Sequence, residues 1–88
     1  MAAPRATVTG RVVFKRKQVD GDVHITPQVG KQFIVLEEIP ELRLKTLPAV
    51  GQKIKASGIV RYDGVHKWWE LHPLVSWKEY TDAAIPPR

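Results

Sequence analysis

The stretch VGQKIKASGIVRYD, residues 50–63, alternates regularly between two sets of side chains. One side carries Ile54, Ala56, Gly58, Val60 and Tyr62, and the other carries Lys53, Lys55, Ser57, Ile59 and Arg61. A repeat of two residues is that of a β-strand with one face turned inward. A glycine in mid-strand allows a bend or a bulge, and Gly58 would let a small sheet curl into a barrel. The segment therefore predicts a strongly curved strand.

Two strands are predicted before it. In residues 7–15, TVTGRVVFK, one side is formed by Val8, Gly10, Val12 and Phe14. The pair Asp20-Gly21 is a strong turn signal, so this strand should form a hairpin with residues 22–29, DVHITPQV. Pro27 lacks an amide donor and therefore marks a strand end, a bulge or a sheet edge.

The remaining segments complete an all-β pattern. Residues 31–39, KQFIVLEEI, follow a Val29-Gly30 turn and are rich in strand-forming side chains. Residues 40–50, PELRLKTLPAV, contain two prolines and predict an irregular connector with at most a brief helix. Residues 67–77, KWWELHPLVSW, form the last strand, in which Pro73 can interrupt the ladder. Five strands predict a small closed barrel, with an open barrel of the SH3 type as the alternative.

Composition restricts the class of protein. The chain has 88 residues and no cysteine, which predicts one domain stabilised by apolar burial in a reducing compartment. The first ten residues lack an apolar leader and no stretch suits a bilayer, so a cytoplasmic protein without a membrane partner is expected. Fourteen Lys and Arg against nine Asp and Glu give a net charge of +5, which makes a polyanion the first partner to consider.

The segments VTGRVV (8–13) and VGQKIKASGIV (50–60) resemble the oligonucleotide/oligosaccharide-binding (OB) fold. The likeness covers residues 6–78, which we take as the domain, with residues 1–5 and 79–88 as flexible termini. A narrower likeness joins DGDVH (20–24), EIP (38–40) and ELHP (70–73) to small, poorly characterised prokaryotic domains. The OB resemblance implies a five-stranded barrel that binds its ligand over the second and third strands. The loops KRKQVDG (15–21) and DGVHK (63–67) would border that face.

Two groups of cations are candidates for phosphate contacts. Lys15, Arg16 and Lys17 fall in a predicted mobile connector, where they either solvate freely or meet phosphates. Lys53, Lys55 and Arg61 form a predicted outward stripe, which fits a solvated face and a groove for a nucleic-acid backbone equally well.

The adjacent Trp68 and Trp69 must point to opposite faces of a strand. Following Leu71 and Val75, Trp69 is expected inside, which leaves Trp68 outside, available for base stacking; a bulge would reverse the pair. The alternative is that Trp68 covers a gap beneath the tail or the connector. Phe33 lies on the predicted ligand face, but parity leaves its direction open and the core is the favoured place for it; Tyr62 fits the barrel rim.

The three histidines give only weak support for a metal site. In a regular strand His66 and His72 would lie roughly 20 Å apart, too far for one ion. His24 and His72 could converge across strands, yet no short paired spacing typical of zinc sites is present. His72, before Pro73, is expected to make a structural hydrogen bond at a strand end. Because no nucleophile stands near a base and an orienting group, we expect no catalytic residue, metal or cofactor.

The sequence thus predicts a non-catalytic domain that binds single-stranded DNA or RNA with little sequence preference. An interaction or adaptor module, binding a protein or a second copy, is the main alternative, and a metal-dependent hydrolase is a third. The residues expected at the nucleic-acid site are Lys15, Arg16, Lys17, Lys31, Phe33, Lys53, Lys55, Arg61, Tyr62, His66, Lys67 and Trp68.

Overall fold

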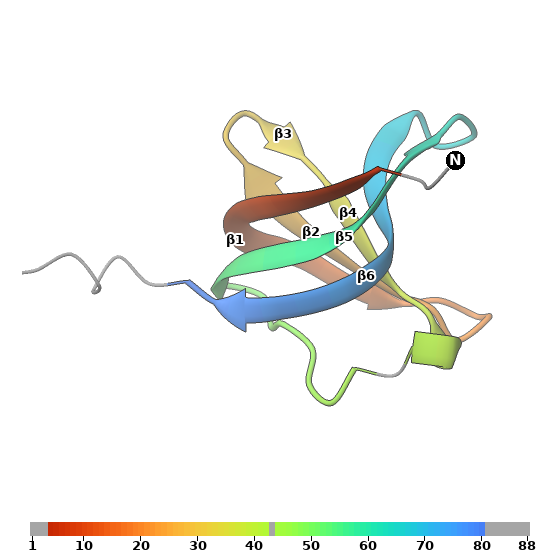
Figure 1. The fold of residues 1–88 in the computed structure, drawn as a ribbon, viewed down its shortest axis with the longest axis horizontal. Coiled ribbons are helices and arrows are strands. Elements are labelled where there is room, and N and C mark those ends of the chain that lie inside the picture. Colours follow the sequence, from red (N-terminus) through yellow and green to blue (C-terminus); the bar gives the residue numbers. More distant parts are fainter. Residues whose placement is uncertain (1–3, 43, 81–88) are drawn as a thin grey trace, which may run out of the picture.

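The computed structural model describes residues 4–42 and 44–80. These residues form six strands and one 3-10 turn (Figure 1). The elements are β1 (Arg5–Lys17), β2 (Val23–Val29), β3 (Gln32–Phe33), β4 (Val35–Glu38), η1 (Pro40–Leu42), β5 (Lys53–Asp63) and β6 (Trp68–Glu79). The predicted all-β fold is confirmed. The expected third strand is divided into β3 and β4, and the connector holds one brief helical turn, as predicted.

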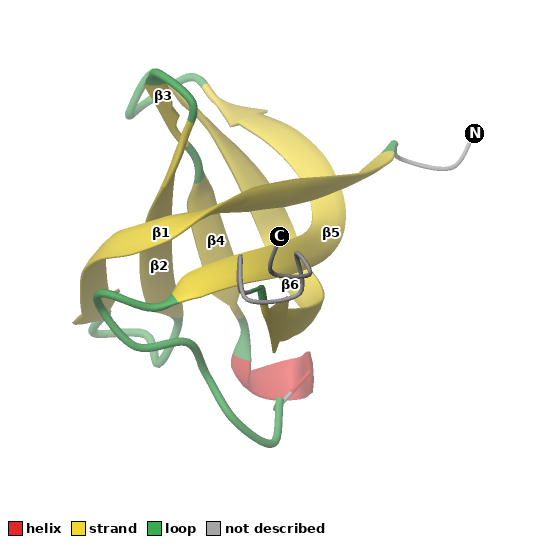
Figure 2. Cartoon of the chain, turned by 90° about the vertical axis from the view of Figure 1, so that its left-hand side faces the viewer, coloured by secondary structure: helices red, strands yellow, loops and turns green. Residues whose placement is uncertain are grey.

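The strands close into a barrel. Its wall runs in the order β1-β5-β6-β4-β2, and pairing between β1 and β2 completes the circle, with the short β3 added beside β2. Strands β4 and β6 run parallel, while β1 pairs with both β2 and β5 in the antiparallel sense. This non-consecutive order is a Greek-key arrangement, as in OB-type barrels. Figure 2 shows the strands curving around one interior, with the helical turn at one end of the wall.

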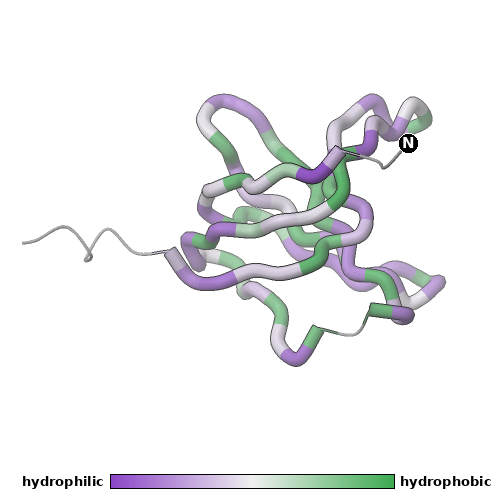
Figure 3. The backbone as a smooth tube through the Cα atoms, viewed as in Figure 1, coloured by the Kyte–Doolittle hydropathy of each residue, from purple (hydrophilic) through white to green (hydrophobic). Residues whose placement is uncertain are grey.

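Alternate residues of the strands supply the interior. The buried apolar cluster consists of Val12, Val23, Ile25, Leu36, Ile54, Ala56, Leu71 and Leu74. The predicted inward positions Ile54, Ala56 and Gly58 are all buried. Hydrophobic and hydrophilic positions alternate along much of the tube in Figure 3, as one-sided burial requires. A single core in which five strands share side chains holds the barrel closed.

Gly58 is where β5 bends across β6. The pairing register shifts on both sides of it, which confirms the predicted bulge. A Cβ atom at this position would lie 2.5 Å from the Pro73 carbonyl oxygen and 2.8 Å from Cβ of Leu71. The ladder passes from Leu74 to Leu71 opposite the bulge, so Pro73 interrupts it as expected. The absence of a side chain at Gly58 therefore lets the backbones approach and the sheet curl.

A second bulge lies in β1. The register with β2 shifts between Val12 and Phe14, opposite Pro27, which is buried within β2. The extra residue, Val13, reverses the alternation that follows it. The prediction that Phe14 shares the inward side of Val12 is therefore wrong, and the Phe14 side chain is 52% exposed.

The strands extend one residue beyond the predicted domain at each end, to Arg5 and Glu79. The expected flexible termini otherwise fall largely on residues 1–3 and 81–88, which lie outside the described residues. Within the described part of the chain, we find no helix with the length and apolar character needed to cross a membrane.

Candidate functional site: an aromatic groove and a histidine and carboxylate cluster

A groove of about 240 Å³ lies on the outer surface of the barrel wall. It is lined by Phe14, His24, Thr26, Phe33, Val35 and Trp68, which come from β1, β2, β3, β4 and β6. We call it the aromatic groove. Rings from four separate strands meet here, so the barrel closure rather than any local segment creates the site.

The pairing of the strands explains which side chains reach the groove. The bulge in β1 turns Phe14 outward, where it pairs with Thr26, and two residues further on Arg16 pairs with His24. Side chains two residues apart share a face, so Arg16 borders the groove from β1. Phe33 and Val35 line the groove, whereas Ile34 packs against the core. The alternation of residues along the sequence left open which of these side chains face outward, and the structure shows that Phe33 and Val35 do. Phe33 is 56% exposed, so the preference for a core position is wrong.

The two neighbouring tryptophans lie on the predicted sides, but their exposures are not as expected. Trp69 shares the inner side with Leu71, and together with Val8 it lines a hollow of about 280 Å³ at an open end of the barrel. There it is 51% exposed and contacts Tyr62, with ring centroids 5.0 Å apart. Trp68, on the outer side, is partly buried. The expected burial of Trp69 is wrong because this residue lies at the end of the barrel. There a side chain on the inner side of the wall points to the open end and not into the core.

Trp68 covers a buried carboxylate on the outer face. Its indole Nε1 donates a hydrogen bond of 3.0 Å to Oε2 of Glu70, which is only 2% exposed. The other Glu70 oxygen lies 3.7 Å from Nε of Arg61. The imidazole of His66 stacks on the indole with ring centroids 4.3 Å apart, and His24 meets it edge-on at 6.3 Å. Trp68 is therefore held by a hydrogen bond to Glu70 and by ring contacts with His24 and His66.

The turn between β5 and β6 fixes His66 over Trp68. Oδ1 of Asp63 accepts backbone hydrogen bonds from Val65 at 2.9 Å and His66 at 3.2 Å. Oδ2 of Asp63 lies 2.8 Å from Nδ1 of His66. This side-chain contact, reinforced by the backbone hydrogen bonds, holds the pKa of Asp63 below its ordinary value of 3.8. Lys67 closes the turn in the left-handed backbone region, with φ of 60°.

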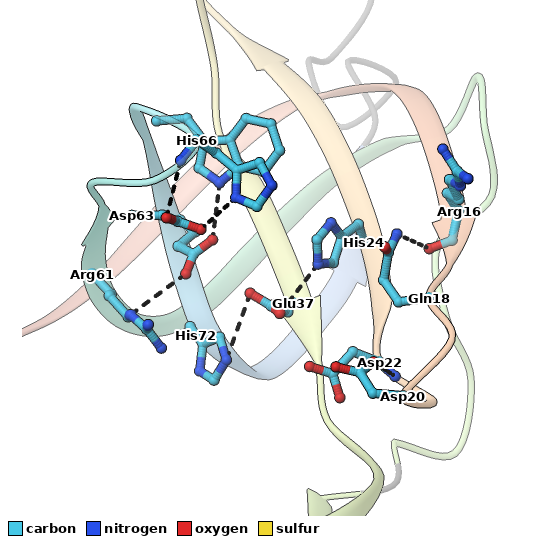
Figure 4. Close-up of polar contacts among 12 residues, drawn as sticks. Arg16, Gln18, Asp20, Asp22, His24, Glu37, Arg61, Asp63, His66 and His72 are labelled. Carbon is cyan, nitrogen blue, oxygen red and sulfur yellow. Dashed lines mark hydrogen bonds and ion pairs between the residues drawn. The ribbon is translucent and has the colours of Figure 1, made fainter.

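Next to the groove lies a group of four residues, Asp22, His24, Glu37 and His72, which we call the histidine and carboxylate cluster. Oε1 of Glu37 is 3.1 Å from Nε2 of His24, and Oε2 is 3.6 Å from Nε2 of His72 (Figure 4). The convergence of His24 and His72 across strands, left open by the sequence, is thus found. His72 stands within β6 rather than at a strand end, so its predicted role there is wrong.

Burial and the nearby charge of Glu70 raise the pKa of Glu37 above its ordinary value of 4.5. The hydrogen bond from His24 and the proximity of His72 act in the opposite direction, but they do not cancel the rise. The Glu37 carboxyl therefore holds its proton to a higher pH than an exposed glutamate does.

The cations Lys15, Arg16 and Lys17 do not act as one loop. All three belong to β1, so the prediction of a mobile connector is wrong. Lys15 and Lys17 lie on the side opposite Arg16 and, with Lys45, line a separate groove of about 600 Å³ between the β1–β2 end and the connector. Arg16 alone of the three faces the aromatic groove.

The predicted stripe on β5 is likewise divided. Lys55 lines a hollow with Thr7, Ser57, Ser76, Trp77 and Lys78 on the wall formed by β1, β5 and β6. Lys53 lies 5.2 Å from the centre of the Tyr80 ring, whereas Arg61 lies beside Glu70. Lys31 and Lys67 are exposed in the turns before β3 and β6.

Of the predicted site residues, the structure brings Arg16, Phe33, His66 and Trp68 together around the aromatic groove. Phe14 was missed, and only the proline opposite its bulge signalled the change of face. No family model matches the chain, and no curated protein matches its sequence.

Proposed function

We propose that the protein binds single-stranded nucleic acid without catalysis, with bases stacked in the aromatic groove. The observation that supports this most is the gathering of Phe14, Phe33 and Trp68 in one 240 Å³ groove on the outside of the wall. Both phenylalanine rings are more than half exposed, and large rings left in water suggest a binding surface. Stacking of a base on such a ring contributes about 1–3 kcal/mol and tolerates any base, because every base has a flat face.

Charges around the groove suggest the direction of the nucleic-acid backbone. Asp22 and Glu37 would repel phosphates on one side, whereas Arg16 borders the groove on β1. The exposed turn residues Lys31 and Lys67 add cations on the segments that lead into β3 and β6. We therefore propose that phosphates follow the β1 side of the groove. For a single strand, each phosphate that the protein neutralises makes the slope of log affinity against log salt concentration more negative by about 0.7.

The direct test is a titration of fluorescently labelled single-stranded DNA and RNA oligonucleotides at low salt. Binding should quench tryptophan emission, because Trp68 lines the groove, and affinity should fall as salt rises. The substitution Arg16→Glu should reduce both affinity and salt dependence. Lys55→Glu is the matched control, since it makes the same charge change in a hollow lined by other residues. Absence of both quenching and a salt-sensitive anisotropy change at micromolar protein would rule the proposal out.

A protein-binding or self-associating module is the second candidate, and a different surface favours it. Trp69 and Tyr62 stand exposed at the open barrel end, above a hollow whose apolar lining includes Val8, Ile34 and Val60. An exposed apolar surface of this kind suits a protein partner. Sedimentation of the protein over a range of concentrations tests self-association, and Trp69→Ala should abolish any dimer found. Retention of the dimer in that variant would exclude this surface as the contact.

A further inference from the structure

We infer that Asp22, Glu37 and His72 bind a divalent transition-metal ion such as Zn²⁺. This site goes beyond the proposed function and does not depend on it. One oxygen or nitrogen from each residue lies within 4.8 Å of the others, and all three side chains are partly buried. The donors are two carboxylates and an imidazole, a set that suits Zn²⁺ and related ions.

The separations fit a metal with little rearrangement. Ligands of a tetrahedral Zn²⁺ ion, at about 2.0–2.2 Å from the metal, stand about 3.3–3.6 Å from one another. Oε2 of Glu37 and Nε2 of His72 are already 3.6 Å apart. Closing the widest gap allowed by the cluster, 4.8 Å, requires a movement of roughly 1.5 Å. Asp22 stands in the turn region just before β2, where rotation of its short side chain can provide this movement.

The strands hold the ligands in place before any ion binds. Glu37 comes from β4 and His72 from β6, which pair in parallel at Val35–Glu70 and Leu36–Leu71, one residue before each ligand. Asp22 is set beside them because the next residue, Val23, pairs with Glu38. The three ligands come from three chain segments, and strand pairing brings them together. The entropic cost of ordering them is therefore already incurred when the protein folds.

The charges of the cluster favour a cation. Among the described residues, the Asp22 carboxylate makes no hydrogen bond or ion pair. The backbone amide of Asp22 donates a hydrogen bond to Oδ1 of Asp20. A divalent ion would give the partly buried Asp22 carboxylate a partner of opposite charge.

His24 acts as a positioning residue. Its Nε2 lies 3.1 Å from Oε1 of Glu37, which orients the carboxylate so that Oε2 faces His72. Such partners of a metal ligand commonly change affinity by about 10- to 100-fold when removed. Three protein ligands leave one position of a tetrahedral ion open for water or for a phosphate oxygen. The proposed metal site lies next to the aromatic groove, because His24 lines the groove and contacts the ligand Glu37.

The test uses the full chain, freed of any histidine tag, and Zn²⁺ as the probe. Isothermal titration calorimetry should show one saturable site, and Co²⁺ should give visible absorption bands typical of a low coordination number. Asp22→Asn and His72→Gln should each weaken Zn²⁺ binding by at least about tenfold. Asp22→Asn is the safest variant, since its carboxylate has no partner to lose among the described residues.

Two matched controls locate the ion. Asp20→Asn changes an acid in the same turn, and His66→Gln changes a histidine that stacks on Trp68 outside the cluster; both should bind Zn²⁺ as the parent does. Metal-free melting curves establish that each variant is folded. Absence of saturable Zn²⁺ binding to the parent protein at millimolar metal would overturn the inference. Equal losses in the control variants, or undiminished binding by folded Asp22→Asn and His72→Gln, would overturn it too. Oligonucleotides are absent throughout, so the result is independent of the proposed function.

Discussion

The imidazole of His66 lies parallel to the indole of Trp68, with ring centroids 4.3 Å apart and planes within 6°. One face of Trp68 is therefore covered by the protein's own ring, which is itself held by Asp63. Much of the ring surface that a ligand could reach comes instead from Phe14 and Phe33, the more exposed rings of the aromatic groove. The proposed interface therefore depends on Phe14 and Phe33 as well as on Trp68. The two adjacent tryptophans in the sequence do not reveal the contribution of these phenylalanines.

Replacing Phe33 by alanine should weaken single-strand binding. Loss of one stacking ring is expected to cost about 1–3 kcal/mol of binding free energy, measured by anisotropy at low salt. Trp69→Ala removes an equally exposed ring at the barrel end, outside the aromatic groove, and serves as the control. If the Trp69 variant loses as much affinity as the Phe33 variant, the bases do not lie in the aromatic groove.

Asp63 should control the turn that carries His66. Asp63→Asn keeps an oxygen for the amides of Val65 and His66 but loses the charge beside the imidazole, whereas Asp63→Ala loses both. At neutral pH the melting temperature should fall in the order parent, Asn variant, Ala variant. Near-ultraviolet circular dichroism should report a looser His66–Trp68 stack in the same order.

The lowered pKa of Asp63 also predicts a pH dependence. Its stabilising contribution is present above the ordinary value of 3.8 and is lost as pH falls through the lowered value in the fold. The gap in melting temperature between the parent and Asp63→Ala should therefore narrow in acid. A gap that stays constant down to the acid limit of folding would contradict the ion pair with His66.

Glu37 should give the opposite pH dependence. Its pKa is raised in the fold, so its favourable contribution is complete below 4.5 and is lost as pH rises through the raised value. Glu37→Gln imitates the protonated acid and removes that loss. Melting curves in the presence of a chelator should show the variant gaining on the parent as the pH rises above 4.5. Glu41→Gln, in η1, is the control, and its melting temperature should change with pH as that of the parent does. The prediction would be refuted if the melting temperature of Glu37→Gln also ran parallel to that of the parent.

Gly58→Ala should destabilise the barrel strongly. The new methyl group would stand 2.5 Å from a backbone oxygen of Pro73 and 2.8 Å from Cβ of Leu71, and neither can move aside without shifting β6. Overpacking of this kind costs about 1–3 kcal/mol of the free energy of unfolding, measured by urea denaturation. Gly64→Ala is the matched control, because nothing lies within 4 Å of its added methyl group. Equal stability of the two variants would contradict the close approach of β5 and β6 at Gly58.

Local patterns determined much of the fold. Alternation over residues 50–63 located the inward side chains of β5, and the Asp20-Gly21 and Val29-Gly30 signals located two turns, since both glycines adopt positive φ. Gly58 and Pro73 indicated where the ladder would break. These features are legible because they arise from neighbours along the chain: strand periodicity, backbone freedom and a missing amide donor.

The candidate site was predicted less well. Parity placed Trp68 and Trp69 on the correct sides of β6, but exposure depends on where along the barrel a residue stands, and Trp69 faces out of its open end. Phe14 was assigned to the wrong side, because one extra residue in β1 reverses every facing after it. Lys15, Arg16 and Lys17 at the end of β1 are divided between two faces, because successive residues of a strand point to opposite faces.

The sequence by itself determined an all-β chain, its turns, its curved fifth strand and its excess of positive charge. The tertiary structure alone decided that Phe14, Phe33 and Trp68 share one groove and that His24 and His72 meet on Glu37. Those groups are separated by up to 54 positions along the chain, from Phe14 to Trp68, and barrel closure joins them. Pairing between distant strands depends on register and bulges summed over the whole sheet, which no local pattern contains.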